Sequence, residues 1–176
     1  YSLKTGIEYR SARLNFLYVP LPLHSFNTGA SLVQYTSFPG ELNPLGENSY
    51  ILPREMDPEQ AVEWAVYLSD NMTISPRLSM EAGIRYSRYQ RLGPVTVFHY
   101  DPEKPKEPET IIDTTAFPAG RTAVSYGGLE PRFSLRYALG DSSSFKLSYN
   151  RINQYINLIS NTLVMNPADI WKLSDS

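Results

Sequence analysis

Apolar and polar residues alternate with a period of two along several stretches of the chain. The clearest stretch is LEPRFSLRYALGDSSSFKLSYNRINQY, residues 129–155, in which apolar side chains hold odd positions on both sides of GDSSS. The same alternation covers about residues 1–15, 59–69 and 73–90. Because successive side chains of a strand point to opposite faces, alternation of this length favours strands over helices. We therefore expect an all-β chain with about five strands, two of them within 129–155.

Each of these segments has one apolar and one charged face. In the first segment the two faces carry Leu3, Ile7 and Tyr9 against Lys4, Glu8 and Arg10. In the others the apolar face carries Val62, Trp64, Val66, Leu78, Ile84, Phe133, Leu135, Tyr137, Leu147 and Tyr149. The charged face carries Glu63, Glu81, Arg85, Glu130, Arg132, Arg136 and Lys146. Which face points inward decides between a soluble sheet and a membrane sheet.

The parity of the apolar positions predicts the turn of the first hairpin. In 59–69 and in 73–90 the apolar residues are even-numbered, so the numbers of facing residues must add up to an even number. A register shifted by one residue would place the apolar face of one strand beside the polar face of the next. Pairing Leu68 with Ile74 predicts a three-residue turn at 70–72, where Asp and Asn suit a tight turn.

The same argument applies to the second hairpin. Pairing Leu139 with Phe145 predicts a three-residue turn at 141–143. Residues 17–58 and 91–123 are long and rich in Pro and Gly, and we expect them to be loops. Short turns then lie at one end of an antiparallel up-and-down meander and long loops at the other. This asymmetry is typical of outer-membrane barrels.

Composition narrows the class of protein. Charge is nearly balanced, with 16 basic and 18 acidic residues, so no nucleic-acid partner is expected. Mean hydropathy is −0.33, and no run approaches the ~20 apolar residues of a membrane helix, although a membrane barrel needs none. The absence of cysteine excludes disulfides and Cys-based metal sites. The chain begins at Tyr1 without a signal peptide, from which we expect an internal fragment of a larger protein.

Two interpretations of the apolar face compete. In a soluble β-sandwich, a lipocalin-like barrel or a lectin-like binding module, the apolar face would form the core. The segment 73–90, however, is longer than the usual strand of about five or six residues. Trp64, Tyr86, Tyr137 and Tyr149 lie on the apolar face, where the aromatic girdles of a membrane barrel occur. These features favour a transmembrane barrel with its apolar face toward lipid.

In the barrel interpretation the charged face lines the lumen. The predicted register puts Glu63 diagonal to Arg77 and Glu81, within reach of cross-strand pairing. We expect wall salt bridges, or contacts with a domain inside the barrel, in preference to a polar path for substrate. A membrane barrel needs at least about eight strands. The chain is therefore part of a barrel, or weaker strands lie in GASLVQYTS and GPVTVFHY.

The stretch LEPRFSLRYALGDSSSFKLSYNRINQYINLISNT, followed by NPADIWKLSDS, resembles the mid-barrel region of TonB-dependent outer-membrane receptors of the Bacteroidota type. AVEWAVYLSDNMTISPRLSMEAGIRYSRYQRLGP is similar to the preceding hairpin, and KTGIEYR to an earlier strand. The resemblance covers most of the chain and implies residues 1–176 of a partial barrel, with about 22 strands in the whole receptor.

The resemblance also implies a location and a function. Such a receptor lies in the outer membrane of a Gram-negative bacterium and imports a scarce nutrient: a siderophore–iron complex, cobalamin or a glycan. TonB supplies the energy through an N-terminal plug, which nothing in this sequence matches. A surface lipoprotein is a further possible partner. A passive porin is the alternative within the membrane class, and a plug domain encoded upstream would separate the two.

Candidate chemistry is sparse. His24 and His99 are single histidines in expected loops and are interpreted as surface residues, and no G-x-S-x-G motif occurs, so we expect neither an enzyme nor a metal or other cofactor. The aromatic residues of the expected loops could contact substrate by stacking, although packing between loops is the preferred interpretation. These residues are Tyr35, Phe98, Tyr100 and Phe117.

Overall fold

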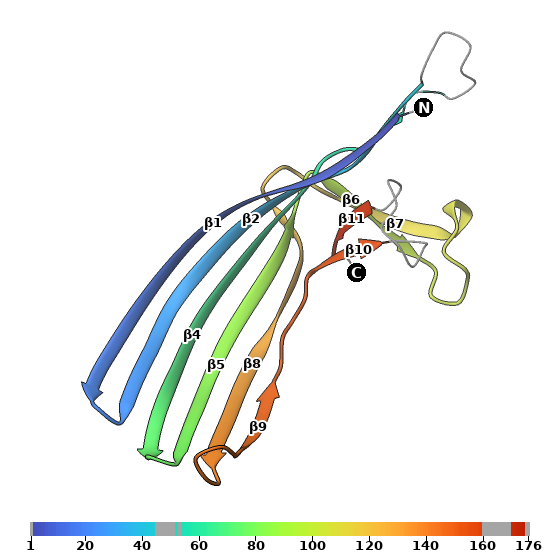
Figure 1. Ribbon diagram of the computed structural model, residues 1–176. Helices are drawn as coiled ribbons and strands as arrows, with labels where there is room; N and C mark the ends of the chain where they lie inside the picture. The colour runs from blue at the N-terminus through green and yellow to red at the C-terminus, as the bar shows by residue number, and fades with distance from the viewer. Residues whose placement is uncertain (1, 45–51, 53, 160–169, 175–176) are drawn as a thin grey trace.

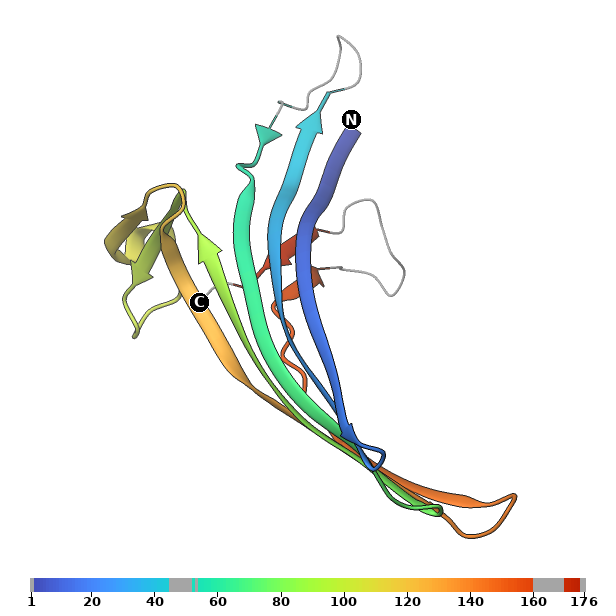
Figure 2. The ribbon, with the colours of Figure 1, turned by 90° about the vertical axis from the view of Figure 1, so that its left-hand side faces the viewer.

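The computed structural model describes residues 2–44, 52, 54–159 and 170–174. Its main element is an antiparallel sheet with the strand order β1-β2-β4-β5-β8-β9, a meander in which each strand pairs with the next in this order. These strands are β1 (Ser2–Leu21), β2 (His24–Asn43), β4 (Glu59–Ser75), β5 (Leu78–Leu92), β8 (Thr122–Ala138) and β9 (Ser144–Asn150). Figures 1 and 2 show a long, curved sheet that resembles a section of a cylinder wall. The expected all-β, up-and-down fold class is confirmed.

The remaining elements form small pairs beside this meander. β3 (Arg54–Glu55) pairs with β2, β6 (Val95–Tyr100) with β7 (Ile111–Phe117), and β10 (Ile156–Ile159) with β11 (Ile170–Leu173). A 3-10 turn, η1 (Pro108–Thr110), precedes β7. None of the described residues forms a helix that is long and apolar enough to cross a membrane.

Short turns and long connections lie at opposite ends of the sheet (Figure 1). The short turns are Pro22–Leu23, Pro76–Arg77 and the connection 139–143, whereas residues 93–121 join β5 and β8 at the other end, where β2 also ends and β4 begins. The expected asymmetry is therefore present, but the long loop expected over 17–58 is wrong. Most of it forms the end of β1, a two-residue turn and all of β2. β2 contains GASLVQYTS and β6 lies in GPVTVFHY, the two weaker candidate strands.

The turn expected at 70–72 is also wrong. β4 continues to Ser75, so that Leu68 faces Ile84 and not Ile74. Asp70 is held within the strand because its carboxylate accepts hydrogen bonds from the backbone N–H of Ser25 (3.2 Å) and is 2.7 Å from the His24 ring nitrogen.

The turn lies instead at Pro76–Arg77. The hydroxyl of Ser75 accepts hydrogen bonds from the backbone N–H groups of Arg77 (3.3 Å) and Leu78 (3.1 Å). A side-chain oxygen that bonds the backbone two or three residues later stabilises a turn, and Pro76 presets the backbone angle φ that such a turn requires.

The second hairpin has the predicted parity but not the predicted register. Tyr137 faces Phe145 and Leu135 faces Leu147, whereas the prediction paired Leu139 with Phe145. The strands separate after Ala138, so the connection spans five residues and not the three at 141–143. The backbone N–H of Leu139 donates to the carbonyl of Ser143 (2.9 Å) and closes this connection.

The register gathers each predicted set of side chains on one face of the sheet. Facing residues of neighbouring strands share a face. Row by row, for example, Phe133 faces Ala82 and Tyr149. One face, here called the apolar face, holds Val62, Trp64, Val66, Leu78, Ile84, Phe133, Leu135, Tyr137, Leu147 and Tyr149. The other, the polar face, holds Glu63, Glu81, Arg85, Glu130, Arg132, Arg136 and Lys146.

The beginning of β1 departs from the expected assignment. Tyr9 faces Tyr35 and therefore lies on the polar face, while Arg10 shares the other face with Gln34. Further along β1 the apolar face is continued by Leu14 and Phe16. The face that carries the apolar side chains of β1 thus changes near the middle of the strand. The first part of β1 lies at the end of the sheet with the long connections.

Burial on the sheet is the reverse of that in a soluble protein. Ser69, Ser87 and Glu130 on the polar face are buried, with exposed fractions of 2%, 0% and 7%. On the apolar face, Leu68 and Leu147 remain about half exposed, at 50% and 53%. An exposed apolar surface of this extent marks contact with lipid or a partner.

Close packing on the polar face predicts an effect at one glycine. A Cβ atom on Gly83 would lie 2.7 Å from Arg132 Nε and 2.8 Å from Ser69 Cβ, whereas nothing lies within 4 Å of one on Gly6. We expect Gly83→Ala to lower the free energy of unfolding by about 1–3 kcal/mol, since overpacking costs this much. Gly6→Ala is the matched control. Urea titration of the complete barrel, refolded in lipid vesicles, measures both; equal effects would contradict the register.

Candidate functional site

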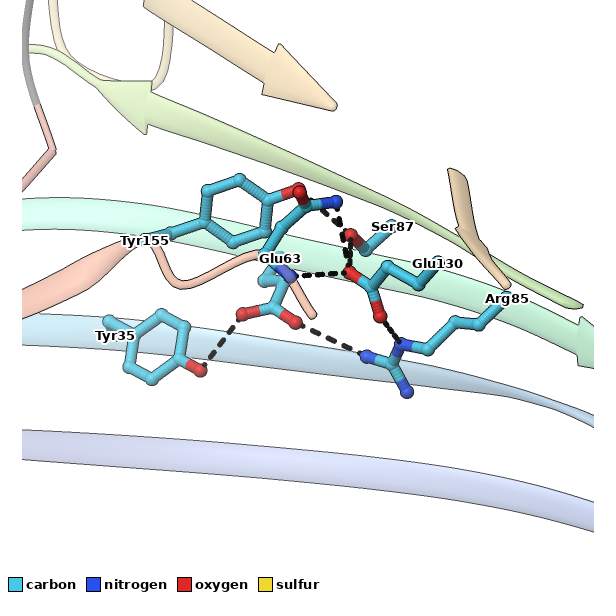
Figure 3. A network of polar contacts seen from close by, with 7 residues as sticks. Tyr35, Glu63, Arg85, Ser87, Glu130 and Tyr155 are labelled. Carbon is cyan, nitrogen blue, oxygen red and sulfur yellow. Dashed lines mark hydrogen bonds and ion pairs between the residues drawn. The ribbon is translucent and has the colours of Figure 1, made fainter. Parts of the chain in front are cut away.

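An arginine shared by two carboxylates lies at the centre of the polar face (Figure 3). Arg85 Nη2 is 3.3 Å from Glu63 Oε1, and Arg85 Nε is 3.3 Å from Glu130 Oε2. The register explains both contacts, because Arg85 of β5 faces Glu130 of β8 and, on its other side, Tyr67 of β4. Glu63 lies on the same face four residues along β4 from Tyr67. The expected diagonal contacts of Glu63 with Arg77 and Glu81 are therefore replaced by a pair with Arg85.

Hydroxyl groups donate further hydrogen bonds to both carboxylates. The Tyr35 hydroxyl donates to Glu63 Oε2 (3.2 Å), and the Ser87 hydroxyl donates to Glu130 Oε1 (2.5 Å). Tyr155 places its own hydroxyl 2.8 Å from Ser87. A buried carboxylate is tolerated when ion pairs and hydrogen bonds satisfy it, as they do at Glu130.

The chain that follows β9 leaves the sheet and crosses the polar face. The backbone N–H of Arg151 still donates to the carbonyl of Pro131 (3.1 Å). Asn153 then donates to Glu130 Oε1 from its backbone N–H (3.4 Å) and from its side-chain Nδ2 (3.1 Å). The ring of Tyr155 stacks on Tyr89, with centroids 5.2 Å apart and planes at 12°. This segment is therefore held to the wall by polar and aromatic contacts.

A small apolar cluster lies beside the polar network. Tyr89 and Leu173 are fully buried, and they pack with Ala61 and Tyr155. The cluster forms where β11 lies against β1, β2 and β4. Figure 2 shows the β10–β11 hairpin next to the upper part of the sheet. Among the described residues, the buried apolar core thus lies on the polar face, at the end with the long connections.

The other predicted wall charges are more exposed. Arg132 Nε is 3.6 Å from Glu81 Oε1, with side chains 43% and 39% exposed. Arg136 faces Lys146 directly, and no described residue forms an ion pair with either of the two. The expected salt bridges within the wall are thus present for five of the seven charged residues.

A hollow of about 340 Å³ lies beside the polar network and is bordered by both the crossing segment and the wall. Its lining includes Glu63, Arg85, Glu130, Arg132 and residues 150–153. Both signs of charge and two amide side chains border it, which suits a polar occupant. Among the described residues, no three His, Asp or Glu side chains lie close enough together to hold a metal ion.

The structure separates the aromatic residues that were expected in loops. Tyr35 is a strand residue of β2 and bonds Glu63, so its assignment to a loop is wrong. Phe98 and Tyr100 belong to β6, and Phe117 belongs to β7, in the hairpin between β5 and β8. Phe98 is 48% exposed there. Whether any of these rings contacts substrate stays a prediction.

The β6–β7 hairpin and the two histidines also form polar side-chain contacts. Lys104 and the backbone N–H of Glu103 donate hydrogen bonds to Asp101 and lower the pKa of its carboxyl. His99 Nε2 is 3.0 Å from the Thr115 hydroxyl. His24 lies at the start of β2 beside Asp70, so neither histidine lies in an unstructured loop.

The sequence reasoning missed four residues of the network: Ser87, Tyr89, Asn153 and Tyr155. Tyr89 gave a usable signal, because this aromatic residue lies on the otherwise charged face of 73–90. Asn153 and Tyr155 gave none, since nothing in their pattern indicates that the chain turns back over the sheet.

The network predicts unequal costs for breaking two ion pairs. Arg85→Met leaves the buried Glu130 carboxylate without its cation, and we expect a loss of about 3–5 kcal/mol in the free energy of unfolding. Glu81→Gln breaks the more exposed pair with Arg132 and should cost less than about 1 kcal/mol. Urea titrations of the refolded barrel measure both variants. A small effect at Arg85 would show that the network does not form.

Comparison with known proteins agrees with this architecture. A protein-family model described as "TonB dependent receptor-like, beta-barrel" matches residues 4–167, which include most of β1, all of β2, β4, β5, β8 and β9, and the polar network. No curated protein matches the chain. The resemblance to TonB-dependent receptors is confirmed, while the Bacteroidota type stays a prediction. The chain belongs to the TonB-dependent receptor-like β-barrel family.

Proposed function

We propose that residues 1–176 form part of the wall of a closed barrel that actively imports a scarce nutrient across the outer membrane. Membership of the family makes the chain part of an outer-membrane receptor and transport barrel, a class that transports and does not catalyse reactions. The finer proposal concerns the orientation of the wall, the substrate and the energy source.

The observation that carries the proposal is the reversed burial of the two faces. Leu14, Leu68 and Leu147 are at least half exposed on the apolar face, while Glu130 is buried on the polar face. In a lipid bilayer the exposed apolar face is satisfied by acyl chains, and the charged face by a water-filled or plugged lumen. β1 and β9 are the outer strands of the described sheet. In lipid their free edges need further strands, because unpaired backbone groups cost several kcal/mol each.

Aromatic side chains and turn lengths support the orientation. Trp64 and Tyr86 lie together on the apolar face, with ring centroids 5.7 Å apart, as in an aromatic girdle. In the next row of this face beyond Trp64, Val62 of β4 faces Gln34 of β2, which faces Arg10 of β1. Polar residues therefore enter the apolar face at this row, and the apolar band ends here. The short turns then lie in the periplasm and the long connections outside the cell.

The proposed cargo is a nutrient such as a siderophore–iron complex, cobalamin or a glycan. The paired charges and amides around the hollow at Arg85 offer donors and acceptors to a polar solute. Energy would come from TonB through a plug encoded outside these residues, and a surface lipoprotein could deliver the nutrient. The exposed Phe98 of the β6–β7 hairpin is available for stacking on the outer side.

Dependence on TonB tests the proposed function directly. We expect uptake of the nutrient, in cells that express the whole receptor, to fall to background when the tonB gene is deleted. Deletion of the receptor gene alone is the control for other entry routes. Uptake that persists without TonB but requires the receptor would favour a passive porin, and recovery of the protein in the soluble periplasm would favour a soluble binding module.

The orientation of the faces predicts the effect of a charge. We expect Leu135→Arg to lower the free energy of unfolding in lipid vesicles by about 2–4 kcal/mol if the residue lies near the midplane of the bilayer. Ser134→Arg, which places the same charge on the polar face opposite Glu81 and between Arg132 and Arg136, is the matched control and should cost less, because water reaches this face and screens the charge. Refolding in bilayers of different thickness should change the cost at Leu135 alone. Equal costs at both positions would contradict the orientation.

A further inference from the structure

The chain departs from the sheet at a position where the sheet itself continues. β9 pairs with β8 only between Arg132 and Ala138, and ends at Asn150. β8 extends ten residues further, to Thr122. Instead of covering that edge, residues 151–157, here called the strap, turn inward over the polar face (Figure 3).

The wall beneath the strap has a complementary shape. Gly128 of β8 carries no side chain, and a Cβ atom there would lie 3.0 Å from Asn153 Nδ2. The space beside Gly128 is therefore filled by the side chain of Asn153. Two strands away, Ala61 leaves room for Tyr155, whose exposed fraction is 8%. The strap is thus seated in the wall and does not merely rest on it.

A single carboxylate connects the strap to the wall. Glu130 Oε1 accepts hydrogen bonds from Asn153 of the strap and from Ser87 of the wall, while Glu130 Oε2 pairs with Arg85. Hydrogen bonds to a charged acceptor are roughly twice as strong as neutral ones. Loss of the charge at Glu130 would therefore weaken the attachment of the strap more than loss of any neutral partner.

We propose that the strap is an inward-folded closure latched on Glu130, and that it must lift from the polar face for the nutrient to pass. The inference rests on the proposed function in one respect: the polar face has to line the lumen. The strap then narrows the lumen near the end with the long connections. Lifting it would uncover Tyr89, Ser87 and Glu130, which are all buried beneath it.

A disulfide between strap and wall tests its position. In the whole receptor we introduce Gly128→Cys together with Asn153→Cys, since the Cβ of residue 128 would be 3.7 Å from Asn153 Cγ. The reference pair is Ser134→Cys with Ser148→Cys, which face each other on β8 and β9. We expect both pairs to be oxidised rapidly in isolated membranes. Failure of the strap pair, while the reference pair forms, would overturn the proposed position.

The latch is tested in the same background. In this background residue 153 keeps its backbone N–H donor to Glu130 Oε1 (3.4 Å) but loses its side-chain donor. Glu130→Gln should therefore slow oxidation of the strap pair by about threefold, as expected when the remaining charge-assisted hydrogen bond becomes a neutral one. Glu81→Gln, a carboxylate of the same face that bonds Arg132, should not change the rate. Neither substitution should affect the reference pair, which also reports that the barrel has folded. An unchanged rate with Glu130→Gln would overturn the role of Glu130.

Uptake measurements test the closure separately from the proposed function. With the strap pair oxidised, we expect nutrient uptake to fall at least about fivefold and to recover when a reductant restores a mobile strap. Full uptake with the disulfide formed would overturn the closure. Loss of TonB dependence in the unmodified receptor would overturn the proposed function instead, and the oxidation rates would still report the position and the latch.

Discussion

Hydrogen bonding between neighbouring backbones is the constraint on which the rest of the structure depends. It sets the register of the long strands, and the pleat then assigns every side chain to one of two faces. A slip of one residue would move Arg85 to the apolar face and Tyr86 to the polar face. The contacts of Arg85 with Glu63 and Glu130 form only in the observed register, in which Arg85 faces Tyr67 and Glu130. The ion pairs and the backbone ladder therefore specify the same alignment.

Reversed burial follows from this alignment and not from an unusual composition. The same alternation would serve a soluble sandwich if a second sheet covered the apolar face. What differs is that the protein's own chain covers the polar face, with Tyr155 and Leu173 packed on Tyr89. Burial of Glu130 is affordable there because Arg85, Ser87 and Asn153 satisfy it.

The sequence predicts the faces of this sheet better than its turns. Alternation assigns Glu63, Arg85 and Glu130 to one face correctly, since parity survives any shift of the register by two residues. A shift of the register by two residues does move the position of a turn. Asp70 is a residue type that favours turns, but it lies in a strand because Ser25 and His24 bond its carboxylate. β2 was expected mainly as loop, with only GASLVQYTS as a weaker candidate strand, because Thr28–Ser31 is small or polar on both faces and the strand character comes from pairing with β1 and β4. The strap could not be predicted, since its contacts join residues far apart in sequence.

The placement of the strap on one half of the polar face has a physical reason. Near the long connections the charges are matched, with Arg85 between two carboxylates and Arg91 paired with Glu59 at 2.8 Å. Near the short turns Arg136 faces Lys146, and like charges directly opposite each other repel. Burying a matched and hydrogen-bonded pair costs far less than burying two unmatched cations. A segment that folds into the barrel therefore covers the matched half, and the cationic half remains open to water, which screens the repulsion.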